Sequence, residues 1–136
     1  LGERLAAAAR EHEPDAVRLA GPALGAVALA ASASLASGLP FVIVRDSAKE
    51  YGTANRLEGV FEAGERVCLV EDVVTSAGAA LEAVEALRAA GLEVGTAICV
   101  LDREEGGTQA LSKKGVRLQA LYTASELVGD SANPHG

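Results

Sequence analysis

The chain has 136 residues, a common size for one domain, and 49% of them are hydrophobic, so it can bury a core of its own. Its formal net charge is −7 at pH 7 and aromatic residues make up 3% of it. This composition disfavours a nucleic-acid partner, which calls for positive charge and stacking side chains. No apolar stretch approaches the roughly 20 residues that span a bilayer, and the charged N-terminus does not fit a signal peptide. We therefore expect a cytoplasmic protein that binds neither nucleic acid nor membrane.

Hydrophobic periodicity, with Gly and Pro as breaks, divides the chain into alternating helices and strands. In chain order the predicted elements are a helix over 1–13, a short apolar strand at 16–20, a helix over 26–37, strands at 41–45 and 66–70, a helix over 79–91, a strand over 93–102, a short helix over 108–115, and a last strand with a terminal helical turn from Val116. Most of these strands are continuously apolar, which is typical of a parallel sheet covered by helices on both faces. The predicted fold is α/β, in a single domain over residues 1–136 with a frayed tail at 131–136.

Ligands of such sheets bind where parallel strands end and their loops begin. The predicted strand ends place segments 20–25, 45–59, 71–79 and 102–107 at that edge. No group of residues there has the composition of a metal site, because His12 and His135 lie near the termini without neighbouring ligands. Cys68 and Cys99 stand inside apolar runs and are expected in the core.

The stretch 67–80, VCLVEDVVTSAGAA, carries the strongest chemical signal. Its apolar residues lead to two adjacent carboxylates, Glu71 and Asp72, and a turn rich in hydroxyls and small residues then opens a helix. Backbone N–H groups and hydroxyls at a helix N-terminus can hold a phosphate, while the two acids can accept hydrogen bonds from sugar hydroxyls. The turn is not a Walker A loop, because no Lys follows Gly78.

This stretch resembles the signature with which phosphoribosyltransferases bind 5-phosphoribosyl-1-pyrophosphate (PRPP): an apolar strand, two acids, two apolar residues, and a loop of Thr, Ser and Gly. Two positions depart from it. Ala77 stands where Gly is usual and its methyl group disfavours a positive φ. Ala79 stands where a hydroxyl is usual and lacks one phosphate hydrogen bond, worth ~1 kcal/mol. The resemblance assigns PRPP binding to Glu71, Asp72, Val73, Val74, Thr75, Ser76, Ala77, Gly78 and Ala79. The alternative is an ordinary strand–turn–helix with an acidic rim.

The segment 44–59 is similar to a loop of the orotate phosphoribosyltransferases, Arg-Lys-x-x-Lys-x-His/Tyr-Gly, which closes over pyrophosphate. Arg45, Lys49 and Gly52 match it, and Asp46 stands where the family has Lys. The resemblance implies that Lys49 and Arg45 are the catalytic residues. By itself the segment would be read as a solvated, charged loop.

The turn 101–107, LDREEGG, resembles the motif that distinguishes orotate enzymes from purine-specific relatives. The resemblance implies that Arg103 binds the orotate carboxylate, which a guanidinium can do through two hydrogen bonds. It also places Thr75 at the orotate site. By itself the turn is equally consistent with local ion pairs. A further segment, 20–30, is similar to the family's first loop, whose backbone amides face pyrophosphate.

These matches run in the family's order from about residue 15 to residue 128. They imply a type I phosphoribosyltransferase fold, PRPP and orotate as substrates, Mg²⁺ carried by PRPP without a direct protein ligand, and a homodimer. The family's N-terminal portion includes a small hood over the base. The resemblance starts near residue 15 and implies that this portion is missing, with Leu1–Glu13 as its last helix. The chain also begins at Leu1 and contains no Met, as expected of a lost or processed N-terminus or of a fragment of a longer product.

The sequence is consistent with two other functions. One is a non-catalytic PRPP or nucleotide sensor with the same fold, which is suggested by the departures from the family pattern at Asp46, Ala77 and Ala79. A phosphoribosyltransferase for another base, such as a purine, is a further alternative, against which Arg103 argues.

Overall fold

The computed structural model describes residues 1–46 and 56–132. Its helices and strands are α1 (Gly2–His12), β1 (Arg18–Pro22), α2 (Val27–Ser37), β2 (Phe41–Val44), β3 (Leu57–Glu58), β4 (Arg66–Val74), α4 (Gly78–Ala89), β5 (Glu93–Asp102), α5 (Gly107–Lys113), β6 (Arg117–Thr123) and α6 (Ala124–Ala132).

The strands form one six-stranded sheet with the order β3-β2-β1-β4-β5-β6. Neighbouring strands are parallel, except that the two-residue β3 runs antiparallel to β2. The expected parallel α/β sheet is therefore confirmed. Because β1, β2, β4, β5 and β6 point the same way, their carboxyl ends share one edge, which we call the carboxyl edge.

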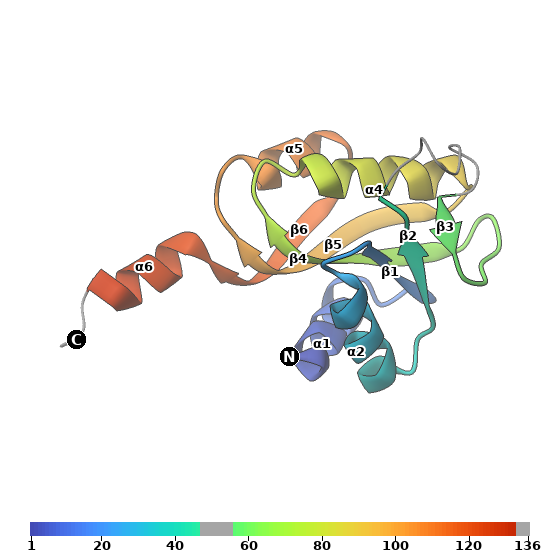
Figure 1. Ribbon diagram of the computed structural model, residues 1–136, viewed down its shortest axis with the longest axis horizontal. Coiled ribbons are helices and arrows are strands. Elements are labelled where there is room, and N and C mark those ends of the chain that lie inside the picture. The colour runs from blue at the N-terminus through green and yellow to red at the C-terminus, as the bar shows by residue number, and fades with distance from the viewer. Residues whose placement is uncertain (47–55, 133–136) are drawn as a thin grey trace.

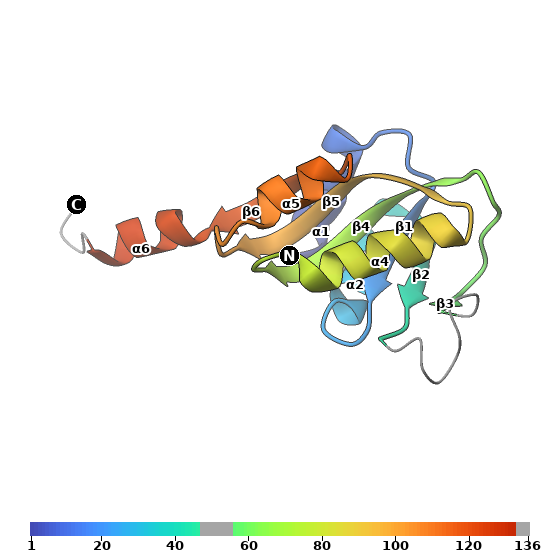
Figure 2. The same cartoon turned by 90° about the horizontal axis from the view of Figure 1, so that it is seen from above.

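Helices cover both faces of the sheet. Helices α1 and α2 lie on one face and α4 and α5 on the other, as the two views show (Figures 1 and 2). The buried strand β4 explains this arrangement, since alternate residues of a strand point to opposite faces. Val67 and Leu69 pack in the cluster with α4, and Cys68 and Val70 pack in the cluster with α1 and α2. All four side chains are fully buried.

Small side chains let α1 and α2 approach each other and the sheet closely. Ala9 of α1 and Ala30 and Ala33 of α2 are buried. A Cβ atom placed on Gly2 would lie 2.8 Å from the Cβ of Ser32, so the two helices already touch there. The alanine-rich helices thus form a thin, closely packed layer.

Within residues 1–46 and 56–132, none of the helices combines the length and apolar character that crossing a membrane requires.

Several element boundaries differ from the predicted ones. Strand β1 covers 18–22, so it continues into the predicted turn at 21–25. Strand β4 extends to Val74 and contains the acid pair, because its end pairs with the end of β5 rather than turning at residue 71. The edge strand β3 was not predicted, since it is short and lies in a polar segment. Helix α6 reaches Ala132, inside the expected tail, and 133–136 lie outside the described residues.

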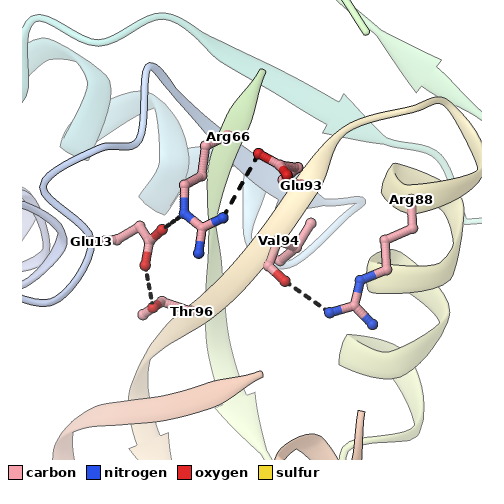
Figure 3. A network of polar contacts seen from close by, with 6 residues as sticks. All are labelled: Glu13, Arg66, Arg88, Glu93, Val94 and Thr96. Atoms are coloured by element: carbon pink, nitrogen blue, oxygen red, sulfur yellow. Dashed lines mark hydrogen bonds and ion pairs between the residues drawn. The ribbon is translucent and has the colours of Figure 1, made fainter. Parts of the chain in front are cut away.

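A polar network ties α1 to the opposite, amino edge of the sheet (Figure 3). Glu13, directly after α1, accepts hydrogen bonds from Arg66 Nε and from Thr96 Oγ1, the latter at 2.7 Å. On the other face, Arg88 of α4 donates to the carbonyl of Val94 at 2.8 Å. Both faces are thereby anchored at the edge away from the predicted site.

Candidate active site

The predicted site segments begin in the last residues of strands or directly after them. Strands β1, β2, β4 and β5 end at Pro22, Val44, Val74 and Asp102. Segments far apart in the sequence are thus brought to one edge, where ligands of parallel α/β sheets bind.

The acid pair occupies the last part of β4. Glu71 is 5% exposed, and this burial, together with the neighbouring charge of Asp72, raises the pKa of Glu71 from 4.5 to about 7. Asp72 is partly exposed, and its Oδ1 accepts a hydrogen bond from the amide of Val73 at 2.8 Å. The two carboxylates therefore differ: that of Glu71 is buried with a raised pKa, and that of Asp72 is partly exposed.

The turn after β4 presents the N-terminus of α4. Thr75 and Ser76 are exposed, whereas Ala77 is buried and adopts a left-handed φ of 75°. An alanine in that region costs ~1–2 kcal/mol, a strain that glycine would not carry. Within the described chain, no side chain caps the first amides of α4. Those amides can therefore hold an anion.

A small cavity of about 30 Å³ lies at this turn. A phosphate oxygen or a water molecule would fit such a space. Most of the residues assigned to PRPP by sequence surround it. Its lining consists of Glu71, Val73, Val74, Thr75, Ala77, Gly78, Ala79 and Ala80.

The loop after β1 reaches the acid pair. A Cβ atom placed on Gly25 would lie 2.6 Å from Asp72 Oδ2, so the glycine backbone passes directly beside that carboxylate. Residue 25 must lack a side chain unless Asp72 moves. The sequence drew attention to this loop but not to Gly25. A glycine in a loop shows no close approach until the fold is known.

The end of β2 holds the first of the two residues predicted to be catalytic. Arg45 Nη2 lies 2.8 Å from Glu58 Oε1 of β3, and this hydrogen bond lowers the pKa of Glu58. The guanidinium of Arg56 donates to the carbonyl of Arg45 at 2.9 and 3.2 Å, which closes the base of the intervening loop. Lys49, the other predicted catalytic residue, lies outside the described residues.

The turn after β5 carries Arg103. Its guanidinium is half-exposed, with Nε 3.4 Å from Glu105 Oε2, and its backbone amide donates to the carbonyl of Val74 at 2.9 Å. Gly107, at the start of α5, packs against the same turn: a Cβ atom there would lie 2.8 Å from the carbonyl oxygen of Thr75. The predicted base-binding turn and the predicted phosphate-binding turn are therefore in direct contact.

Asp102, a buried carboxylate at the same edge, was not singled out from the sequence. It is 7% exposed and accepts hydrogen bonds from the amide of Glu104 at 2.8 Å and the hydroxyl of Thr108 at 3.1 Å. The available signal was its place at the end of a buried strand, followed by a hydroxyl at the second residue of the next helix. That signal cannot distinguish a ligand-binding carboxylate from one that holds a turn.

A parallel sheet whose carboxyl edge joins an acid pair to the uncapped N-terminus of a helix defines a class of α/β proteins that bind phosphorylated ligands. The family model for the phosphoribosyl transferase domain matches residues 1–120. The orotate phosphoribosyltransferase of Methanocella arvoryzae is 53% identical over 112 residues, which cover 82% of this chain and 64% of that protein. That of Halobacterium salinarum is 50% identical over 124 residues, which cover 91% of this chain and 71% of that protein.

The crystal structure of orotate phosphoribosyltransferase from Aeropyrum pernix superposes with a TM-score of 0.86 at 30% identity, covering 96% of this chain and 74% of that one. The chain belongs to the phosphoribosyltransferase family of type I fold, and within it to the orotate phosphoribosyltransferases. It spans 64% of the length of the Methanocella relative and 71% of that of the Halobacterium relative.

Proposed function

We propose that this chain transfers the phosphoribosyl group of PRPP to orotate, producing orotidine 5′-monophosphate and pyrophosphate. The observation that carries the proposal is the contact between two turns at one edge. The Arg103 amide donates to the carbonyl of Val74, the residue that begins the turn leading to the uncapped start of α4. An anion-binding helix end and a half-exposed arginine thus stand side by side, as a phosphorylated sugar and a carboxylated base require.

PRPP occupies the end of β4 and the start of α4. The backbone amides of 77–79, with the hydroxyls of Thr75 and Ser76, hold the 5′-phosphate. Glu71 and Asp72 accept hydrogen bonds from the ribose hydroxyls and favour the positive charge that develops on the ring. Gly25 brings backbone of the first loop beside Asp72, where loop amides can face the pyrophosphate.

Orotate lies between the two turns, with its carboxylate on Arg103 and its ring near Thr75. Arg103 then exchanges the Glu105 carboxylate for that of the base. A ring nitrogen of orotate forms a bond to C1 of the ribose while the bond from C1 to the pyrophosphate oxygen breaks. The electron pair leaves on pyrophosphate, and the proton of the ring nitrogen is released.

The departing pyrophosphate needs positive charge around it. Lys49 and Arg45 supply this charge, and Arg45 exchanges Glu58 for pyrophosphate oxygens as it does so. Mg²⁺ bound to PRPP would neutralise part of the same charge. In this proposal Mg²⁺ has no direct protein ligand. The described part of the chain has no group of three or more His, Cys, Asp or Glu side chains that could hold an ion.

The proposed enzyme acts as a homodimer in the cytoplasm. Leu24 and Leu35 are 85% and 89% exposed, and burial of such side chains against a second copy would be favourable. Cys68 and Cys99 are buried free thiols, which suit a reducing compartment. Sedimentation equilibrium should give twice the 13.8 kDa mass of the chain. A mass of 13.8 kDa at micromolar concentration would contradict the dimer.

The second candidate is a PRPP sensor without catalysis. Ala77 favours it, because this residue adopts at some cost the left-handed conformation in which the family has Gly. Asp46, exposed beside Arg45, adds a negative charge where the family has Lys.

An assay of pyrophosphate release with PRPP, Mg²⁺ and a panel of bases distinguishes these functions. We expect turnover with orotate and none with purines. Lys49→Ala should mainly lower kcat, whereas Arg103→Ala should raise the orotate KM by roughly 30- to 1000-fold, the loss of ~2–4 kcal/mol expected for a charge-assisted contact. PRPP binding by calorimetry without turnover of any base would support the sensor instead.

A further inference from the structure

The buried carboxylate of Asp102 organises the turn between β5 and α5. Asp102 ends β5, where it pairs in register with Val74 of β4 on one side and Thr123 of β6 on the other. Its two carboxylate oxygens accept different hydrogen bonds: Oδ1 accepts one from the amide of Glu104 at 2.8 Å, and Oδ2 accepts one from the hydroxyl of Thr108 at 3.1 Å. One side chain thus holds both the beginning of the turn and the first part of α5.

Glu104 is held in a conformation that residues with side chains rarely adopt. Its φ is +60°, in the left-handed region that favours glycine. Asp102 holds its amide, and its own Oε1 accepts the amide of Ser125 in α6 at 2.6 Å. The turn therefore keeps this conformation through hydrogen bonds of the Glu104 amide and of the Glu104 carboxylate.

Arg103 lies between these two fixed residues. Its amide is bound to the carbonyl of Val74, so its backbone cannot rotate freely, while its guanidinium is half-exposed beside Glu105. The direction in which the side chain leaves the turn is thus set by its neighbours. Fixing this direction before the ligand arrives reduces the entropy lost on binding.

We propose that Asp102 is a positioning residue for base recognition, which aims Arg103 at the carboxylate of the pyrimidine base through the Glu104 amide and the Thr108 hydroxyl. This inference rests on the proposed function, in which Arg103 binds orotate. It goes beyond that function in assigning a specificity role to a buried carboxylate that touches no substrate.

A residue that merely stabilises the fold would affect both substrates, whereas a residue that acts through Arg103 affects orotate alone. The KM values for orotate and PRPP should therefore be measured for Asp102→Ala and Asp102→Asn, each with Arg103 and with Arg103→Ala. Asn is the matched control: its Oδ1 accepts the Glu104 amide and its amide group donates to the Thr108 oxygen. Unfolding curves of every variant report stability separately.

We expect Asp102→Ala to raise the orotate KM about tenfold or more and to leave the PRPP KM within about twofold, while Asp102→Asn stays within about threefold of the parent for both. In the protein that carries Arg103→Ala, the further change Asp102→Ala should raise the orotate KM by less than about twofold, because the effects of residues that act as a unit are not additive. The inference would be overturned if Asp102→Ala raised the KM values for orotate and PRPP equally. It would also be overturned if the effect of Asp102→Ala on the orotate KM simply added to the effect of Arg103→Ala.

Thr108→Val covers the case in which Asp102→Ala does not fold. Thr108 is exposed, so removal of its hydroxyl leaves the core intact. The orotate KM should rise about threefold with Arg103 present and remain unchanged with Arg103→Ala. An unchanged orotate KM in the Arg103 protein refutes the inference and leaves the proposed function standing. A parent protein that turns over another base but not orotate refutes the proposed function, and this inference with it.

Discussion

At the scale of single residues, Glu71 is held in an environment that disfavours its charge. The raised pKa of about 7, against an ordinary 4.5, means that the folded state binds this proton more tightly than the unfolded state does. The associated stability is fully present below pH 4.5 and is lost as the pH rises through 7. A carboxylate that costs stability at neutral pH is expected where function requires it.

Glu71→Gln should remove this pH dependence. The variant and the parent should have similar free energies of unfolding near pH 4.5, and the variant should be the more stable above pH 7 by on the order of 3 kcal/mol. Urea denaturation at several pH values measures the difference. If the difference in free energy of unfolding between the variant and the parent stayed constant between pH 4.5 and 8, the raised pKa assigned to Glu71 would be contradicted. PRPP affinity should fall in the variant, because a ribose hydroxyl binds a carboxylate more strongly than an amide.

Ala77→Gly tests whether the departure from the family signature weakens the phosphate turn. Gly relieves ~1–2 kcal/mol of left-handed strain, but it loses a buried methyl worth ~0.8 kcal/mol and adds backbone entropy to the unfolded chain. We therefore expect stability to change by less than about 1 kcal/mol. Since the Ala77 methyl is buried, PRPP affinity by calorimetry should change less than about threefold. A tenfold gain would favour the sensor interpretation.

At the scale of elements, the contact between α5 and the turn after β4 depends on the absence of a side chain at Gly107. A Cβ atom there would lie 2.5 Å from Val74 Cγ1 and 2.8 Å from the Thr75 carbonyl. Both distances are shorter than real contacts allow, and one of the atoms belongs to the backbone. A side chain at this position must separate the proposed phosphate-binding turn from the proposed base-binding turn.

Gly107→Ala should lower the free energy of unfolding by about 1–3 kcal/mol, as overpacking does, and should weaken both PRPP and orotate. Chemical denaturation and calorimetry with each ligand measure the two effects. Gly78→Ala is the control for stability, because a Cβ there meets nothing within 4 Å, and it should cost nothing or add up to about 1 kcal/mol in the helix. Equal destabilisation by both changes would show that sterics at residue 107 is not the cause.

At the scale of the whole molecule, a polar network and the proposed binding site lie at opposite edges of the sheet. The network of Glu13, Arg66 and Thr96 lies at the amino ends of β4 and β5 (Figure 3). Arg66 and Val74, at the two ends of β4, are separated by roughly 26 Å of strand. Side chains on the two edges can therefore be changed independently.

Arg66→Ala should destabilise the fold by about 2–3 kcal/mol, less than the ~3–5 kcal/mol of a fully buried pair because Arg66 is partly exposed. Its removal leaves Glu13 buried with a single side-chain partner among those described. Glu93→Ala, which removes a 64%-exposed partner 3.9 Å from Arg66, should cost less than about 0.5 kcal/mol. Thermal unfolding of both variants, with PRPP affinity as the second measurement, would test this separation. A changed affinity in Arg66→Ala would contradict it.

The local pattern of the chain was sufficient to predict most of the elements. Apolar runs and helical spacing identified β2, β4, β5, α2 and α4 to within a few residues, because burial on both faces leaves a continuous hydrophobic signal. The pattern ended β4 too early, at Val70 instead of Val74. Polar residues at a strand end resemble a turn, and it is pairing with β5 that keeps Glu71 and Asp72 in the strand.

By itself, the sequence determined the α/β class, the order of the elements and the acid pair followed by a small-residue turn, since these depend on residues close together in the chain. Only the tertiary structure decided which distant residues meet. Gly25 passes beside Asp72, Gly107 packs on Thr75, and Arg45 pairs with Glu58. The difference between a ligand-binding carboxylate and one that holds a turn, as at Asp102, also depends on its partners in space. Such contacts join separate strands, and the parallel sheet brings them to one edge by setting the direction and register of those strands.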